Sequence, residues 1–444
     1  MIRTGIRCAG RNAVSISITG GAWRHTKPRL LSVSRDKAAG TAACVGVLGL
    51  ATAISATVFG GTVSPVPIAV IAGVAVGALH ERFPFVSAPP PPDQPLRVGN
   101  DIDKTTAKDN ATSSTSANLV SFKLDPSFAS TTLLRLGVVC VGAKLSLASV
   151  ATSAALCLPV VVPTIAVTVV AAVGTAHVLG LHRDFAVLMA AGTAICGVTA
   201  ISTVGPAIGA AKTHVAVAVA NVVVFGMLGM IAYPLLAHYL FFDDIEDKDS
   251  LSPSTKAGLF LGVAIHDSSQ VLGAAMSFRD TYGNDEEAFG MATVTKLTRN
   301  LLLVVAVPLL SLLHRSLDRG QSTVAISGSL KKPPLFPLFV LGFLGMAALR
   351  TFGDLLISSN PSLSDGVRAA WKDSYTFIGD TLGGKFFLGT AMAGVGLGTK
   401  VSMLRGVGWR PFVVGGVAAC AASITGVLSI YVLSKMGRKK TLHV

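Results

Sequence analysis

The chain contains the stretch Gly192-Thr193-Ala194-Ile195-Cys196-Gly197-Val198-Thr199-Ala200-Ile201-Ser202-Thr203, and a close copy follows far downstream as Gly389-Thr390-Ala391-Met392-Ala393-Gly394-Val395-Gly396-Leu397-Gly398-Thr399-Lys400. Six of the first seven pairs are identical or similar at one constant offset. Both copies lie in long apolar runs but are rich in glycine and small hydroxyl residues, which interrupt a helix at little cost. The repetition predicts two broken membrane helices, one in each half of an internally repeated chain, that meet near the middle of the bilayer.

The amino-acid composition excludes an ordinary soluble domain. Of the 444 residues, 51% are hydrophobic and only 14% are charged, whereas soluble domains carry about 25% charged residues. The formal net charge of +14 comes from basic residues in the N-terminal arm, the loops and the tail, so it predicts no nucleic-acid partner. The six cysteines are scattered without a Cys-x-x-Cys spacing. They predict neither a metal site nor a disulfide framework.

Eleven apolar windows are long enough to cross a bilayer as helices, which takes roughly 17–25 residues. They cover residues 43–62, 65–81, 129–150, 154–181, 185–211, 213–241, 256–278, 288–314, 334–350, 383–404 and 408–434. The sequence therefore predicts an all-α polytopic membrane protein with about ten or eleven transmembrane helices, of which the first two form a hairpin over residues 43–83.

The position of the motif copies predicts how the windows are grouped. If the two copies are equivalent, residues 65–241 and 256–434 form two inverted five-helix repeats with crossing broken helices. A competing match between residues 142–146 and 398–402 would pair the third window with the tenth and leave the fifth without a mate. The first pairing is therefore preferred.

Three polar segments lie outside the windows. Residues 1–42 are rich in arginine and serine with no acidic residue before Asp36, which is typical of an organellar transit peptide and predicts a multi-pass protein of the mitochondrial inner membrane. The alternative is a cationic arm that fixes the orientation of the first helix. Residues 84–128 are predicted to form a disordered Pro/Ser/Thr loop because they have too few large apolar side chains to bury a core. Residues 435–444 form a basic tail.

The seventh and eighth windows carry charged side chains, which are costly near the centre of a bilayer and therefore suggest a function. The seventh contains His266, Asp267 and Gln270, and the eighth contains Lys296, Arg299 and Asn300 at a spacing that places them on one helical face. Two interpretations remain open. In the first, Asp267 forms a structural ion pair with Lys296 or Arg299. In the second, the surplus positive charge binds a small anion, and the guanidinium of Arg299 donates hydrogen bonds to two of its oxygens. His266 could then carry a coupling proton.

The motif copies supply the remaining candidate substrate-binding residues. Half-helix N-termini present free N–H groups and a positive dipole end to an anion, provided that the nearby side chains are small. The residues that fit this role are Thr193, Gly197, Thr199, Ser202, Thr390, Gly394, Gly396 and Thr399. For the glycines the alternative is tight helix packing without substrate contact.

The sequence carries no recognisable enzyme signature. It lacks a G-x-x-x-x-G-K-[ST] phosphate-binding loop and an H-E-x-x-H motif, so we expect neither an enzyme nor a cofactor. Two hypotheses follow for this membrane-embedded chain. The first is a secondary active transporter that moves a small sulfate, sulfite or sulfonate-like anion by alternating access, coupled to H⁺ or Na⁺, with a possible homodimer. The second is a membrane scaffold or assembly protein with a vestigial transporter fold.

Residues 133–139, 192–197, 264–271, 293–302 and 394–399 resemble the sulfate exporter family of conserved hypothetical membrane proteins. The most specific feature is His266-Asp267 followed by Lys296-Leu297-Thr298-Arg299-Asn300. The resemblance implies a fold similar to that of the cation/proton antiporter and bile-acid symporter superfamily, with two inverted five-helix repeats. The chain departs from the bacterial pattern in its basic extension, its Pro/Ser/Thr loop and Lys400, which stands where bacterial relatives tend to have an acidic residue. The last change leaves the substrate and the coupling ion open.

Overall fold

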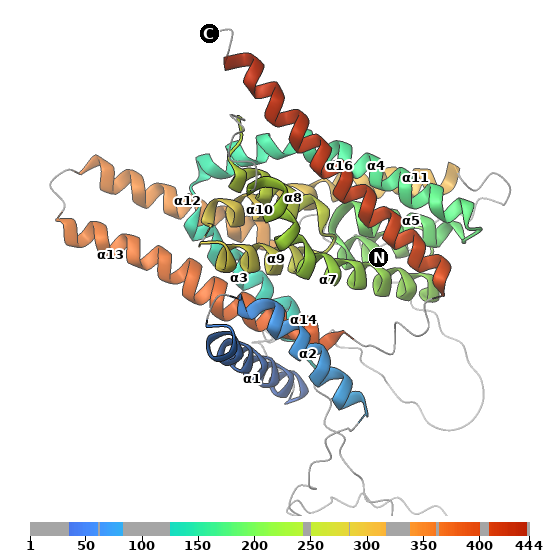
Figure 1. Ribbon diagram of the computed structural model, residues 1–444, viewed down its shortest axis with the longest axis horizontal. Helices are drawn as coiled ribbons and strands as arrows, with labels where there is room; N and C mark the ends of the chain where they lie inside the picture. Colours follow the sequence, from blue (N-terminus) through green and yellow to red (C-terminus); the bar gives the residue numbers. More distant parts are fainter. Residues whose placement is uncertain are drawn as a thin grey trace, which may run out of the picture. The chain divides into compact units, whose positions relative to one another are not determined.

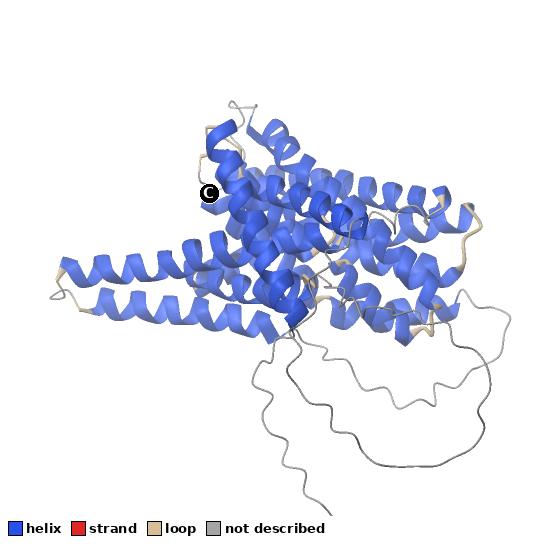
Figure 2. Ribbon diagram, turned by 90° about the horizontal axis from the view of Figure 1, so that it is seen from below, coloured by secondary structure: helices blue, strands red, loops and turns tan. Residues whose placement is uncertain are grey.

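Helices account for every regular element in the part of the chain that the computed structural model describes (Figure 2). This part comprises residues 35–60, 63–82, 125–242, 250–283, 285–316, 338–360, 364–399 and 408–441, all within the compact unit Arg35–Val444. The basic arm up to residue 34, residues 84–124 of the predicted loop, Lys400 and residues 442–444 of the tail lie outside the described residues. The predicted all-α polytopic membrane fold is confirmed.

The element order is as follows (Figure 1): α1 (Arg35–Val58), α2 (Pro65–Arg82), η1 (Phe128–Leu133), α3 (Leu134–Val141), η2 (Gly142–Lys144), α4 (Leu147–Val178), α5 (Arg183–Ala191), η3 (Gly192–Cys196), α6 (Val198–Ala207), α7 (Lys212–Phe242), α8 (Pro253–Ala264), α9 (Ser268–Thr281), α10 (Glu286–Leu301), α11 (Leu303–Ser316), α12 (Leu338–Ser359), α13 (Asp365–Thr376), η4 (Phe377–Leu388), α14 (Gly389–Gly398) and α16 (Trp409–Thr441). Here η1, η3 and η4 are π-helical and η2 is a 3-10 turn. Helix α1 begins inside the predicted arm and α16 continues into the predicted tail, so both spans are longer than the apolar windows indicate.

Within the described residues, six helices are long and apolar enough to cross a membrane: α1, α2, α4, α7, α12 and α16. Helices α10 and α11 make a seventh span if they are taken together across the 47° bend between them. The other windows that suggested spans are divided into shorter pieces. Windows 129–150, 185–211 and 383–404 contain π-helical or 3-10 turns, and window 256–278 is broken by the extended residues Ile265 and Asp267. The total of ten or eleven spans therefore stays a prediction.

Several helices pack against elements that are far apart in sequence: α4 packs along α16, α2 along α14, and α3 against η4 (Figure 1). Helix α8 packs along α10. The buried core includes Phe260, Phe278 and Phe289, which belong to α8, α9 and α10. These three helices are thus the inner layer, and most of their side chains are buried, whereas α4 and α12 expose large apolar residues such as Val170 and Leu341.

Two broken helices meet inside this inner layer, as the sequence predicts, but the second one differs from the prediction. The first is α5–η3–α6, which breaks at Gly197. The expected partner was the segment around Gly394. Instead, a Cβ atom built on Gly197 would lie 2.7 Å from the Oδ2 atom of Asp267, in the break between α8 and α9. Helix α14 has α1, α2, η1, η4 and α9 as its main neighbours. The fifth window therefore meets the seventh in space instead of the tenth, whereas the equivalence of the fifth and tenth windows in two inverted repeats stays a prediction.

Candidate functional site

The local sequence explains where each break falls. Gly197 adopts φ 68° and ψ −129°, a conformation that only glycine reaches at low cost. In the second break Ile265 and Asp267 are extended, and α9 then begins with Asp267 as its N-cap. The Oδ1 atom of Asp267 accepts a 2.9 Å hydrogen bond from the backbone N–H of Ser269. Both breaks leave carbonyl groups at the ends of α8 and η3 without a helical partner.

The guanidinium of Arg299 binds those carbonyl groups from both broken helices. Its Nε donates to the carbonyl oxygen of Ala194 at 2.7 Å, its Nη1 to that of Val263 at 2.6 Å, and its Nη2 to that of Thr193 at 2.5 Å. The side chain is fully buried. One cation of α10 therefore joins the two breaks, because it neutralises the negative ends of two half-helices together.

Lys296 lies one turn earlier on α10 and has the same role. Its Nζ donates to the carbonyl oxygens of Ile195 at 3.0 Å and Ile265 at 3.2 Å, and also to that of His266. An ammonium group has three donors, so all of them are used. The predicted ion pair is not formed among the described residues, because the Oδ1 of Asp267 is bonded to Ser269 instead of a cation. The guanidinium of Arg299 binds backbone carbonyl groups, and its contact with an anion stays a prediction.

Three side chains around the breaks keep buried polar atoms without a hydrogen-bond partner. These atoms are His266 Nδ1, Gln270 Oε1 and Asn300 Oδ1. The side-chain amide nitrogens of Gln270 and Asn300 do have partners. Gln270 Nε2 donates to the carbonyl oxygen of Val223 and Asn300 Nδ2 to the hydroxyl of Ser268, both at 3.0 Å. Buried polar atoms without a partner are rare in folded proteins and indicate a place for water, an ion or a ligand. His266, Gln270 and Asn300 with Asp267 therefore form the candidate site.

The other predicted residues on the first motif copy have different surroundings. The hydroxyl of Thr193 donates to the carbonyl oxygen of Met189 at 2.7 Å, and the carbonyl of Thr193 is the acceptor for Arg299. Thr199 and Ser202 are exposed on α6. The first copy therefore contributes its backbone and Gly197 to the site, and not its hydroxyl groups.

The second motif copy does not join the breaks in the way that the sequence predicts. A Cβ atom on Gly396 would lie 2.3 Å from the carbonyl oxygen of Val70 on α2, and one on Gly394 would lie 3.1 Å from the backbone nitrogen of Ser130. Thr399 donates to the carbonyl oxygen of Val395 at 2.8 Å. The hydroxyl of Thr390 is buried and has no partner. The two glycines thus serve close helix packing, which is the alternative that the sequence left open.

A network of charged side chains near the break between α3 and α4 was not predicted from the sequence. Lys144 Nζ lies 2.5 Å from Asp380 Oδ1 and also pairs with Glu286. Arg279 lies 2.8 Å from Asp280 and 3.5 Å from Asp380. The sequence signal that could have revealed this network is the presence of charges at the ends of three apolar windows.

A second polar cluster lies at the ends of α5, α7 and α11. Asp184 Oδ1 lies 2.9 Å from His314 Nε2, and Asp184 Oδ2 lies 3.4 Å from His214 Nδ1. Burial acts to raise the pKa of Asp184, but the hydrogen bonds from His314 and His214 and the charge of His182 outweigh it, so the pKa lies below its usual value. The carboxylate is therefore negatively charged at neutral pH.

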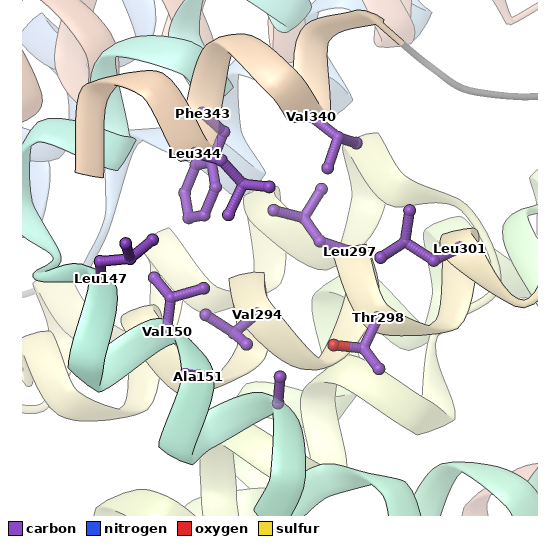
Figure 3. A pocket seen from close by; sticks show the side chains of 11 residues that line it. Leu147, Val150, Ala151, Val294, Leu297, Thr298, Leu301, Val340, Phe343 and Leu344 are labelled. Atoms are coloured by element: carbon purple, nitrogen blue, oxygen red, sulfur yellow. The ribbon is translucent and has the colours of Figure 1, made fainter. Parts of the chain in front are cut away.

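One cavity in the described residues is unsuited to an anion. It has a volume of about 200 Å³ and lies between α4, α10 and α12 (Figure 3). Its lining consists of apolar side chains such as Val150, Leu297 and Phe343, with Thr298 as the only polar lining residue. An ionised substrate would lose its hydration there without compensation.

These observations define an all-α polytopic membrane protein in which two broken helices are joined by buried cations. The model of the family called conserved hypothetical protein 698 matches residues 121–415, and the chain belongs to this family. Its relatives include UPF0324 membrane proteins of Ralstonia nicotianae and Bordetella bronchiseptica, each 33% identical over 65% of this chain and over 73% and 79% of the relative. A UPF0324 membrane protein of Fusobacterium nucleatum is 25% identical over 70% of this chain and 84% of the relative. No solved structure matches the chain.

Proposed function

We propose that the protein is a secondary active transporter that moves a small anion, of the sulfate, sulfite or sulfonate class, by alternating access. The observation that carries this proposal is the meeting of two helix breaks in a buried region, where Arg299 binds carbonyl groups of both at 2.7 Å or less. Non-helical backbone inside a membrane is tolerated only where it is buried in protein or lines a cavity. In transporters such breaks form substrate sites.

The charge distribution supports an anion as the substrate. Lys296 and Arg299 are buried and are opposed by the single carboxylate of Asp267. Most of their donors bind carbonyl groups at the negative ends of α8 and η3, which offset part of this positive charge. The two formal cations still exceed the one carboxylate, and this surplus favours an anion in a region of low dielectric. We infer that the cations attract the anion through this field and that His266 contacts it directly when its Nδ1 carries a proton. The amide oxygens of Gln270 and Asn300 only accept hydrogen bonds, so they would hold the anion through bridging water or bind the coupling cation.

The N-terminus of α6 supplies a further anion-binding element. Its N-cap is Gly197, so no side-chain oxygen caps the first turn. The carboxylate of Asp267 lies against Gly197 and thus takes a position that suits a negative charge at the dipole end of α6. Asp267 is half-buried. Proton or Na⁺ binding to Asp267, or proton binding to His266, would change the charge of the site and is the proposed means of coupling.

The second hypothesis, a membrane scaffold with a vestigial transporter fold, makes a different prediction for the same residues. A scaffold does not need polar atoms of His266 and Asn300 to be held without partners in a buried region, because such atoms destabilise a fold by about 1–3 kcal/mol each. Their presence favours transport. We also propose that the protein is not an enzyme and needs no cofactor. Its proposed partners are lipid, the anion, the coupling ion and a second copy in a homodimer.

The experiment is uptake of labelled sulfate and sulfite into proteoliposomes, with and without a pH gradient. The transporter hypothesis predicts uptake by the wild type and a loss of at least tenfold in His266→Ala and Asn300→Ala, measured on variants that size-exclusion chromatography shows to be folded. Equal uptake by the wild type and by protein-free liposomes, for both anions, would support the scaffold. The mitochondrial inner membrane is the proposed location, on the composition of residues 1–42. Fluorescence imaging of a C-terminally tagged chain tests it.

A further inference from the structure

Three imidazole side chains surround one carboxylate away from the helix breaks. His182 is the N-cap of α5, Asp184 lies in the first turn of α5, His214 lies in the first turn of α7, and His314 lies in the last turn of α11. The side chains of Asp184, His214 and His314 are 14%, 31% and 17% exposed, and that of His182 is 57% exposed. The cluster is thus anchored by helix ends and open to solvent on the His182 side.

The distances from Asp184 Oδ2 to His182 and His214 are long for hydrogen bonds but suit a shared metal ion. The Nδ1 atoms of His182 and His214 lie 3.5 Å and 3.4 Å from Asp184 Oδ2, whereas hydrogen bonds between nitrogen and oxygen are typically about 2.9–3.0 Å long. In a tetrahedral zinc site with bonds of about 2.0–2.1 Å, neighbouring ligand atoms are about 3.3–3.4 Å apart by geometry. The ligand atoms of His182, Asp184 and His214 all lie within 4.8 Å of one another.

His314 takes the position of a supporting residue. Its Nε2 lies 2.9 Å from Asp184 Oδ1, the carboxylate oxygen that does not face the other two histidines. Metal-binding carboxylates and histidines are commonly held by such outer hydrogen bonds, which fix their orientation. The imidazole rings of His182 and His214 are stacked with centroids 4.7 Å apart, which keeps their nitrogen atoms together. One existing contact competes with metal binding by His182. Its Nδ1 accepts a 3.3 Å hydrogen bond from the backbone N–H of Asp184, and a metal ion would replace this bond.

We propose that His182, Asp184 and His214 bind a divalent transition-metal ion, with zinc as the best match, and that His314 orients the carboxylate. Two histidines and one carboxylate with an open fourth position are a known zinc ligand set, and imidazole nitrogen selects zinc over magnesium or calcium. The ion would connect the start of α5 to the start of α7, and His314 would extend the connection to the end of α11. Because α5 leads into the break at Gly197, the metal would fix the position of one half of the broken helix.

The test is metal analysis of the purified full-length protein after removal of any affinity tag. The protein is incubated with ZnCl₂, free metal is removed by desalting, and zinc per chain is measured by mass spectrometry. We expect one zinc per wild-type chain and none in Asp184→Asn or His214→Gln. His314→Gln should retain the site with about 10–100-fold weaker affinity. The matched control is His177→Gln, since His177 is an exposed histidine at the end of α4 outside the cluster. It should keep the zinc.

Replacement of zinc by Co²⁺ gives an independent measurement, because tetrahedral Co²⁺ absorbs visible light strongly. Size-exclusion chromatography shows whether each variant is folded. If Asp184→Asn does not fold, His182→Gln decides the question, since that side chain is mostly exposed. A wild type that holds no zinc at micromolar concentration overturns the proposal, and so do folded variants of the three ligands that each retain one zinc.

Discussion

Replacement of Gly197 by alanine tests the meeting of the two helix breaks. The residue adopts φ 68° and ψ −129°. A non-glycine residue in this conformation lowers the free energy of unfolding by about 1–3 kcal/mol. The new Cβ atom would also lie 2.7 Å from Asp267 Oδ2 and 3.0 Å from Asp267 Cα. To relieve this clash, Asp267 must give up its bond to the N–H of Ser269, which is an N-cap worth about 1 kcal/mol. We expect a total loss of about 2–4 kcal/mol of unfolding free energy.

Glycine residues elsewhere in the chain provide matched controls. Gly180 and Gly209 both have φ of +66°, but a Cβ atom built on either would have no other atom within 4 Å. Gly180→Ala and Gly209→Ala should therefore lower the free energy of unfolding only through the unfavourable backbone conformation, by about 1–2 kcal/mol. The assay is thermal unfolding of the detergent-purified variants, together with anion uptake after reconstitution. If Gly197→Ala unfolds at the same temperature as Gly180→Ala and transports at the wild-type rate, the contact between Gly197 and Asp267 is refuted.

Three further predictions concern the packing of the helices. Arg299→Lys should lower unfolding free energy by at least about 3 kcal/mol, since several buried carbonyl groups lose their donor at about 1–3 kcal/mol each; a melting temperature within 2 °C of wild type would contradict this role. Gly396→Ala should lose about 1–3 kcal/mol because its Cβ atom would lie 2.3 Å from the carbonyl oxygen of Val70, and unchanged stability would exclude the close α2–α14 contact. Lys144→Glu and Asp380→Lys should each destabilise the protein, and the double variant should recover about 0.5–3 kcal/mol as coupling energy in thermal unfolding. Strict additivity would show that the two charges do not interact.

The sequence was sufficient for the membrane fold and for much of the site. Apolar windows of the length of a bilayer predict helices because a lipid environment leaves the backbone few other options. Charges inside two adjacent windows indicated His266, Lys296 and Arg299 as neighbours, and the structure places them together, since Lys296 donates to the carbonyl oxygen of His266. Glycine within the apolar run containing Gly197 predicted a helix break, and the break is found there.

The roles of the cations could not be predicted, because a sequence does not show which backbone groups are left without partners. Arg299 and Lys296 bind carbonyl oxygens of residues more than a hundred positions away, such as Thr193 and Ile195. The prediction that the two motif copies meet was wrong for a related reason. A glycine suits both a helix break, as at Gly197, and close helix packing, as at Gly396, and only the surrounding atoms distinguish the two roles.

The most direct test of the account is anion uptake by the Asp267→Asn variant in parallel with the wild type. Asparagine keeps the N-cap of α9, so the fold and its melting temperature should be preserved, while the carboxylate beside Gly197 is lost. We expect wild-type proteoliposomes to accumulate labelled sulfate or sulfite, and we expect the variant to change the dependence of uptake on the pH or Na⁺ gradient. Folded wild-type protein that moves neither anion, or a variant with the wild-type response to both gradients, would contradict the account.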